Sequence, residues 1–187
     1  MRYPASQTAE RHERVLDEAS RLFRAKGIAG ASIAEVMKAS GLTHGAFYAH
    51  FESKEALACA SIDHAMDQLN RELGETVASS ETPKVAFLDH YLSKRHRDHP
   101  ENGCAMPTLA IEVAREPGMR QTFTRRVTKM IASFSANLPW RRGRSKEEQA
   151  ICFMSAIVGA MVLARAVDDP DLSDKILIAT RNELSRQ

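Results

Sequence analysis

Polar side chains gather in a short stretch near the N-terminus, residues 43–50, with the sequence THGAFYAH. Thr43 and His44 can hydrogen-bond to base edges in the major groove of DNA, and the threonine methyl can meet the methyl group of thymine. Tyr48 and His50 carry polar groups suited to phosphate oxygens. The set suits a helix presented to a DNA groove better than a buried helix or a catalytic loop.

Two short predicted helices position these side chains. Ser32 and Glu35 form the S-x-x-E pattern of a capping box, and Gly41 ends the helix that the box opens. A longer helix precedes them and stops near Gly27, and Thr43 can cap the helix that follows. One small core is predicted from the apolar residues Leu16, Phe23, Ile33, Val36, Leu42, Phe47 and Phe51. With these inside, residues 43, 44, 45 and 48 face outward at the start of the third helix, where recognition helices reach base edges.

Gly45 and Lys54 extend the predicted surface. A glycine inside a helix costs about 1 kcal/mol relative to alanine, so an exposed Gly45 predicts close backbone approach to another surface. Lys54 lies in the first turn of the next helix, where exposed N–H groups also favour anions. The alternatives are a tolerated first-turn glycine, a half-buried Tyr48 that only packs, and a Lys54 that is merely solvated.

The remaining sequence repeats helical periodicity and contains no sustained strand pattern. We therefore predict an all-α fold of about nine helices, with a helix-turn-helix domain over residues 1–52 and a larger helical domain over 53–187. The later helices are expected at residues 53–77, 84–97, 107–115, 120–136, 145–167 and 170–185, with a loop at 98–104.

Composition sets wide limits on function. The hydrophobic content of 43% and the charged content of 27% are those of an ordinary globular protein, and a net charge of +2 requires any basic surface to be local. We expect no signal segment and no membrane span, because the longest apolar run, 150–164, falls short of about 20 residues. Cys59, Cys104 and Cys152 fit neither a disulfide framework nor a zinc site. A cytoplasmic protein without metal or cofactor is expected.

Residues 15–57 closely resemble the N-terminal domain of the TetR family of transcriptional regulators. The matching segments are LFRAKG, SIAEVMKASGLTHGAFYAHF and SKEAL, and their spacing agrees without a gap. The resemblance implies base-facing positions at Thr43, His44 and Gly45. It implies phosphate contacts at Tyr48, His50 and Lys54, with Ser32 joining them.

The helix predicted at 145–167 carries small residues at helical spacing, which permit close approach of another helix. Together with the last helix it predicts a four-helix bundle with a second copy of the chain, as the resemblance also implies. The predicted dimer interface consists of Ser155, Ala156, Gly159, Ala160, Ile176 and Leu177. The alternative is that both helices simply close the core of one chain.

Aromatic and pliable side chains on the middle helices are candidates for an effector pocket, since methionine adapts to irregular ligands. They are Phe87, Tyr91, Cys104, Met106, Phe123, Met130, Phe134, Phe153 and Met154. Proteins that resemble this family usually bind a small, rather apolar effector there, although such residues are also ordinary core.

Cys104 carries the competing interpretation. Nearby His96, Arg97 and His99 could lower the pKa of its thiol and make it a redox sensor or the nucleophile of an enzyme. No third orienting group or oxyanion donor accompanies it. A non-specific architectural DNA binder is a further alternative. We therefore predict a regulator that is not an enzyme, a homodimeric repressor released from a near-palindromic double-stranded DNA operator by a small-molecule effector.

Overall fold

The computed structural model describes the backbone of residues 5–186 and the side chains of residues 8–71, 74 and 79–186. Within these residues the chain forms nine α-helices and two 3-10 helices and no strand, so the all-α prediction is confirmed. The elements are α1 (Ala5–Gly30), α2 (Ile33–Ala39), η1 (His44–Ala49), α3 (Lys54–Ala78), α4 (Pro83–Tyr91), α5 (Lys94–Asp98), η2 (Pro100–Asn102), α6 (Met106–Arg115), α7 (Pro117–Asn137), α8 (Lys146–Ala166) and α9 (Pro170–Ser185).

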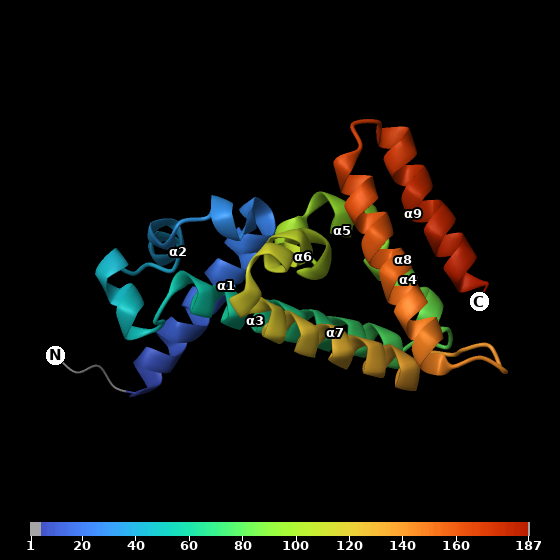
Figure 1. Cartoon of the computed structure of the whole chain (residues 1–187), viewed down its shortest axis with the longest axis horizontal. Helices are drawn as coiled ribbons and strands as arrows, with labels where there is room; N and C mark the ends of the chain where they lie inside the picture. The colour runs from blue at the N-terminus through green and yellow to red at the C-terminus, as the bar shows by residue number, and fades with distance from the viewer. Residues whose placement is uncertain (1–4, 187) are drawn as a thin grey trace.

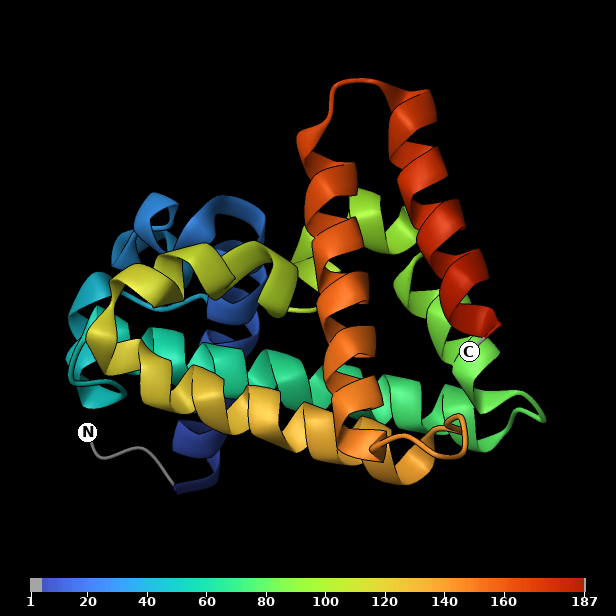
Figure 2. The ribbon, with the colours of Figure 1, turned by 45° about the vertical axis from the view of Figure 1, so that its right-hand side comes forward.

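The helices give an elongated molecule (Figure 1). Elements α1, α2 and η1 lie at one end, and the pair α8 and α9 stands at the other. Helices α3 and α7 lie side by side along the length of the molecule, and α8 crosses them (Figure 2). Helix α3 therefore contacts both α1 at one end and α4 at the other, so it joins the two ends physically.

One continuous apolar core runs through the described residues, from Val15 in α1 to Leu184 in α9. The core predicted for the first three helices is confirmed: Phe23, Val36 and Phe47 are almost fully buried, and Ile33 and Leu42 pack against them partly buried. The core is continuous across the predicted boundary at residues 52 and 53, and the division into two domains there stays a prediction.

The glycines and the capping box predicted near the N-terminus have the local structures that these residue types favour. The helix α1 breaks at Gly27, whose φ of 79° is open to glycine, and one further turn extends to Gly30. Ser32 and Glu35 form the predicted capping box, with the Glu35 N–H donating to Ser32 Oγ at 3.2 Å. Gly41 has a φ of 71° and follows α2. These turns fix where the next element begins.

The third helix differs from the expected form because it is a 3-10 helix of six residues. Its backbone bonds span three residues, as in the Ala46 N–H bond to the Thr43 carbonyl at 3.0 Å. Short segments adopt this tighter winding readily. Thr43 is the N-cap residue, but its side chain makes no capping bond.

Three expectations in the second half are corrected. The helix expected at 84–97 is broken after Tyr91, because Ser93 Oγ accepts from the His96 N–H at 3.1 Å and so caps a separate helix α5. The predicted loop contains the 3-10 turn η2. The helix α7 begins at Pro117 rather than Arg120, since proline is favoured at the first helical position.

By length and composition α8 could cross a membrane, but 39% of its apolar window is buried inside the chain. Its buried face includes Phe153, Ile157 and Met161, which belong to the core. The helix α8 is therefore apolar because one of its faces packs into the core, while its other face lies outside the core.

Candidate nucleic-acid interface

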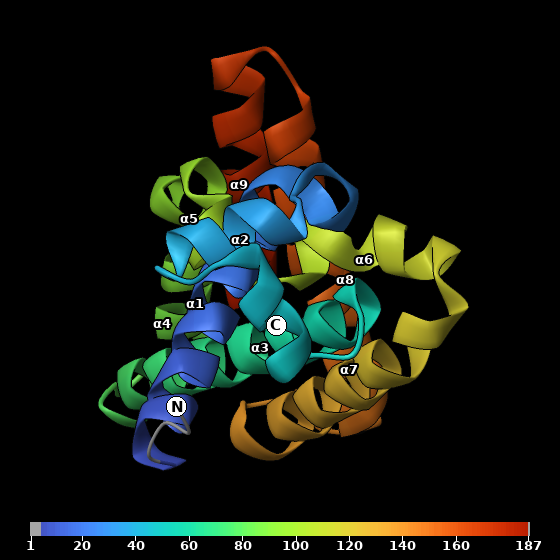
Figure 3. The ribbon, with the colours of Figure 1, turned by 90° about the vertical axis from the view of Figure 1, so that its left-hand side faces the viewer.

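The residues predicted to contact DNA through η1 are Thr43, His44, Gly45 and Tyr48, and we call them the reading surface. They lie outside the core at one end of the molecule, which faces the viewer in Figure 3. Thr43, His44 and Gly45 are all exposed, and Tyr48 has 69% of its surface exposed. A Cβ atom added at Gly45 would meet nothing within 4 Å. The four residues form one uncovered surface along η1, available to an external partner.

Aromatic contacts hold η1 in place from the inside. Phe47 is fully buried, and its ring lies 6.1 Å from that of Phe51 and 5.1 Å from that of Tyr48, centre to centre. The Leu42 N–H donates to the Met37 carbonyl at 2.8 Å, which ties the turn between α2 and η1. The exposed side chains therefore stand on a fixed backbone.

The 3-10 winding changes which residues share a face. Side chains three apart are aligned in such a helix. Gly45 and Tyr48 therefore lie one above the other on the outer side, while His44 and His50 follow the line of the buried Phe47. His44 is exposed because it begins the helix, and His50 at the opposite end is half-buried.

His50 packs beside a residue that the sequence analysis omitted. The rings of His12 and His50 are 5.9 Å apart between centres, and His12 also stacks on Phe51 at 4.7 Å. Burial lowers the pKa of His50, and the charges of His12 and Arg11 lower it further. The segment ERHER at residues 10–14, two acids and two arginines around His12, carries no net basic charge and gave no signal that His12 would lie beside the third helix.

The other predicted phosphate contacts differ in how available they are. Lys54 is the first residue of α3 and is half-buried. Ser32 is exposed, but its hydroxyl both accepts from the Glu35 N–H and donates to Glu35 Oε2 at 3.0 Å. Hydrogen bonds from Ser32 and Lys26 lower the pKa of Glu35 to about 2. The Ser32 hydroxyl is thus already engaged within the capping box.

The residues predicted to form a pocket are only partly brought together. Phe87 and Met130 line a cavity of about 590 Å³ between α3, α4 and α7, together with Phe134 and Leu138. Tyr91, Cys104, Met106 and Phe153 are buried in the core and do not line the cavity, and Phe123 packs partly buried against the core. The rings of Tyr91 and Phe153 lie directly behind the lining, 5.5 Å and 5.7 Å from that of Phe87 between centres. The lining also includes polar side chains for which the sequence offered no signal, namely Asn70, Ser80, Ser133 and Asn137.

Cys104 has the opposite environment from the one that the competing interpretation, a reactive thiol, requires. It is fully buried, and burial raises the pKa of its thiol despite the charges of Arg165 and Arg24. Its N–H donates to His96 Nε2 at 3.0 Å, so the nearby histidine is engaged with the backbone rather than with the sulfur. Neither accessibility nor thiolate character supports a nucleophile here. Among the described residues no group of three His, Cys, Asp or Glu is placed to hold a metal ion.

The residues predicted for the dimer interface are divided between surface and core. Ser155 is exposed, and Ala156 and Gly159 are half-buried, whereas Ala160 and Leu177 lie in the core of their own chain. Ile176 packs partly buried against the core. The same two helices expose larger apolar side chains that the sequence analysis missed, namely Ile151, Leu163, Leu172 and Ile178.

Comparisons with known proteins agree with this arrangement. Residues 15–60 match the sequence profile of the family described as "Bacterial regulatory proteins, tetR family". The HTH-type transcriptional repressor DhaR of Mycobacterium sp. (strain GP1) is 24% identical over 102 residues, which cover 54% of this chain and 52% of DhaR. This chain therefore spans about half the length of that relative.

Solved structures extend the similarity to nearly the whole chain. A TetR transcriptional regulator from Chloroflexus aurantiacus J-10-FL superposes with a TM-score of 0.79 at 26% identity, over 97% of this chain and 95% of that one. A TetR-family regulator from Cytophaga hutchinsonii gives a TM-score of 0.81 at 21% identity, over 98% of both chains. With an exposed helix-turn-helix and the matching profile over residues 15–60, the N-terminal region belongs to the TetR family of transcriptional regulators, and the whole chain has the fold of solved TetR-family regulators.

Proposed function

We propose that the protein is a homodimeric, ligand-responsive repressor that binds a near-palindromic double-stranded DNA operator. The observation that carries the proposal is the uncovered surface of Thr43, His44, Gly45 and Tyr48 on a backbone fixed by Phe47. No packing within the described residues requires glycine at position 45, since its Cβ site is open. Close approach of the η1 backbone to a DNA groove supplies the reason for it.

In this proposal Thr43, His44 and Gly45 face the bases. Phosphate contacts come from Tyr48, His50, Lys54 and Ser32. Because the Ser32 hydroxyl already has two partners, we assign it the weakest of these contacts. Residues 1–52 act as the DNA-binding unit and residues 53–187 as the effector-binding and dimerisation unit, in the cytoplasm. The similarity to DhaR, a transcriptional repressor, supports repression rather than activation.

Selection of bound fragments from a random DNA pool tests the DNA assignment. The selected site should be preferred over random DNA by about 10³-fold or more at fixed salt, whereas a non-specific architectural binder would show no such preference. Thr43→Ala or His44→Ala should cost about 1–3 kcal/mol at one operator position. Thr128→Ala, an exposed threonine of α7, is the matched control.

Lys54→Ala separates phosphate contact from base contact. It should weaken binding to all sequences alike and reduce the slope of affinity against salt by about one. A changed sequence preference with an unchanged salt slope would contradict the role given to Lys54.

The exposed apolar side chains of α8 and α9 support the dimer. Two copies that pair through these helices would present two η1 segments, which must span half-sites about 34–36 Å apart. Leu163 is 57% exposed, and Leu163→Glu should give a monomer in analytical ultracentrifugation. Ile111→Glu is the control, because Ile111 is 62% exposed on α6 and should leave the dimer intact. A dimer that survives Leu163→Glu and Ile178→Glu together would refute this interface.

The cavity between α3, α4 and α7 is the proposed effector site. Phe87, Met130 and Phe134 favour an apolar ligand, and the amide and hydroxyl groups of its lining supply hydrogen bonds. An effector that binds better to a dimer whose two η1 segments do not match the spacing of the half-sites shifts the population away from the DNA-binding form. Ser133→Trp should fill part of the cavity and abolish release of operator by a compound found in a screen, without changing operator affinity itself.

A further inference from the structure

A second, larger concavity opens where α1, α3 and the segment from α4 to η2 meet. Its volume is about 980 Å³, and it shares no lining residue with the cavity between α3, α4 and α7. Figure 3 shows α4 and α5 on the opposite side of the molecule from α6 and α7. We call this concavity the arginine cleft. Its cationic and imidazole side chains are Arg24, Arg71, Arg95, His90, His96 and His99.

Positive charge predominates in the lining, although Asp67, bonded to Arg126, lies near enough to Arg71 for that charge to lower the pKa of the carboxylate. None of the described residues that line the arginine cleft is Asp or Glu. The acids at its margin have partners: Glu101 bonds to His99 at 3.2 Å, and Asp17 accepts from Gln68 at 3.0 Å. Concave surfaces of one charge sign concentrate the field and attract counter-ions.

Arg24 gives the cleft a fixed cationic wall. Only 7% of its surface is exposed, and its Nε donates to the Ser20 carbonyl at 3.1 Å. Its Nη1 donates to the Gly103 carbonyl at 2.8 Å, which connects α1 to the turn after η2. Because the fold already holds this guanidinium, little conformational entropy is lost when it meets an anion.

His96 adds a neutral polar wall. Its Nε2 accepts from the Cys104 N–H, so its Nδ1 carries the proton and donates to the Tyr91 carbonyl at 2.6 Å. The cleft's permanent charge therefore comes from the three arginines, which belong to α1, α3 and α5. Guanidinium groups bind carboxylate and phosphate oxygens in pairs of parallel hydrogen bonds.

We propose that the arginine cleft binds a small organic anion with at least two carboxylate or phosphate groups, held by Arg24, Arg71 and Arg95. The volume lies in the range of small-molecule sites, roughly 300–1,000 Å³. The inference goes beyond the proposed effector site and does not depend on it. Since Arg24 belongs to the DNA-binding end and the other two arginines do not, the bound anion bridges the two ends of the molecule and stabilises the described arrangement.

Calorimetric titration of the full chain with citrate and with pyrophosphate, at constant ionic strength and without DNA, tests the proposal. Saturable binding of either probe is expected, and the tighter of the two identifies the preferred group. Arg71 and Arg95 are both exposed, so Arg71→Gln with Arg95→Gln should leave the fold intact, as circular dichroism can check. The double variant should bind about 100-fold more weakly, tenfold for each charged hydrogen bond removed.

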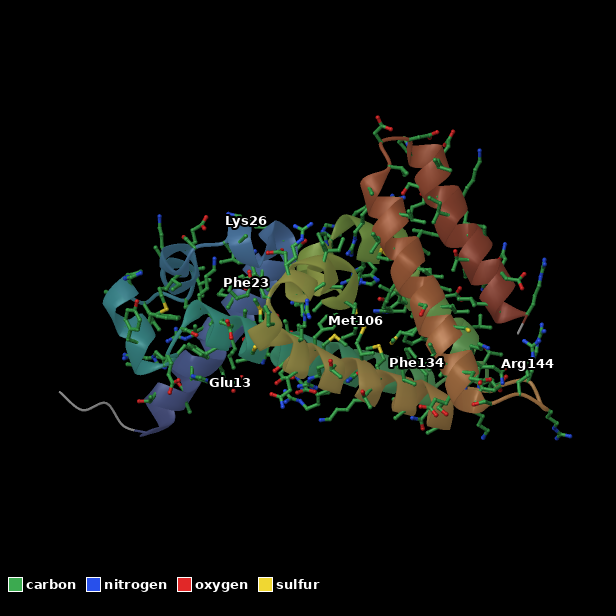
Figure 4. The ribbon with its side chains drawn as sticks, in the orientation of Figure 1. Glu13, Phe23, Lys26, Met106, Phe134 and Arg144 are labelled. Atoms are coloured by element: carbon green, nitrogen blue, oxygen red, sulfur yellow. The ribbon has the colours of Figure 1, made fainter. Side chains whose placement is uncertain are left out.

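Arg144→Gln is the matched control, because Arg144 is an exposed arginine in the turn between α7 and α8, far from η1 (Figure 4). It should bind the probe as the wild type does. Absence of saturation by both probes up to about 10 mM, weaker than most specific ligands, would overturn the proposal. Equal affinity of the double variant and the wild type would overturn it as well. DNA binding that weakens in the double variant, without anion binding by the wild type, would assign the cleft to backbone phosphates instead.

Discussion

Replacing Glu112 by alanine is expected to loosen the connection between α6 and the DNA-binding end. Glu112 lies on α6, and its carboxylate accepts the N–H of Ile28 at 3.1 Å and the N–H of Ala29 at 2.8 Å. Both N–H groups follow the break in α1 at Gly27, where the helix geometry is interrupted. The carboxylate thus supplies acceptors to backbone groups beside the break.

The magnitude follows from the exposure of the two bonds. A hydrogen bond to a charged group contributes about 1.5–3 kcal/mol when water cannot replace it. The bond to Ile28 is part-buried and the bond to Ala29 is exposed, so water can replace the second but only partly the first. Glu112→Ala should therefore lower the free energy of unfolding by about 2 kcal/mol, and Glu112→Gln, which keeps one acceptor oxygen, by about 1 kcal/mol.

Urea denaturation followed by circular dichroism measures the change, at one fixed protein concentration because association would shift the result. Glu116→Ala is the control, since that exposed side chain makes no capping bond at the start of α7. If the alanine variants at 112 and 116 lose the same stability within about 0.5 kcal/mol, the usual range for a surface substitution, the reasoning about Glu112 is refuted.

Three further predictions concern buried side chains. Phe47→Ala should cost about 3–5 kcal/mol in urea denaturation, because the ring is fully buried beneath the reading surface; a loss below 1 kcal/mol would contradict that packing. Burial lowers the pKa of His96 to about 4. The free energy of unfolding should therefore be highest above pH 6.5 and fall by up to about 3 kcal/mol as the pH drops toward 4. His96→Gln should flatten that dependence, and an unchanged slope would refute it. Lys84 is buried without a hydrogen-bond partner among the described residues and lies 4.3 Å from the Trp140 ring centre, so Lys84→Met should raise stability by about 1 kcal/mol. A loss of stability would mean that the cation–ring contact outweighs desolvation.

Local signals in the sequence were enough for the class of fold and for the positions of the first three helices, though not for the 3-10 form of the third. Ser32 with Glu35 and the glycines at 27 and 41 determine turns through their own backbone and side-chain bonds, so they work without knowledge of the rest of the chain. Ser93 was missed because helical periodicity continues through it. Its hydroxyl caps α5 and also donates to the His90 carbonyl at 2.8 Å. These side-chain bonds to the backbone compete with continuation of the helix, and the spacing of apolar residues gives no information about them.

Tertiary contacts decided the parts of the sites that the sequence could not predict. Periodicity identifies apolar residues but not which of them face a cavity, so Phe87 and Met130 could not be separated from the buried Tyr91 and Phe153. Cys104 was expected beside His96, Arg97 and His99, but the charges that act on its thiol are those of Arg165 and Arg24. Its pKa is nevertheless raised, because burial outweighs their charges and burial depends on the packing of the whole chain.

The contacts that hold α1 at two points along its length indicate how a movement distant from η1 would change DNA binding. Near its start His12 stacks on Phe51, and twelve residues later Arg24 is bonded to Gly103. An unbroken helix of that length is about 18 Å long, so a tilt of about 6° at one end displaces the other by about 2 Å. In a dimer whose half-sites are about 34–36 Å apart, both copies would shift, and major-groove contacts tolerate little displacement. Small movements of η2 against α1 would therefore be enough to change operator affinity, without any rearrangement inside the reading surface itself.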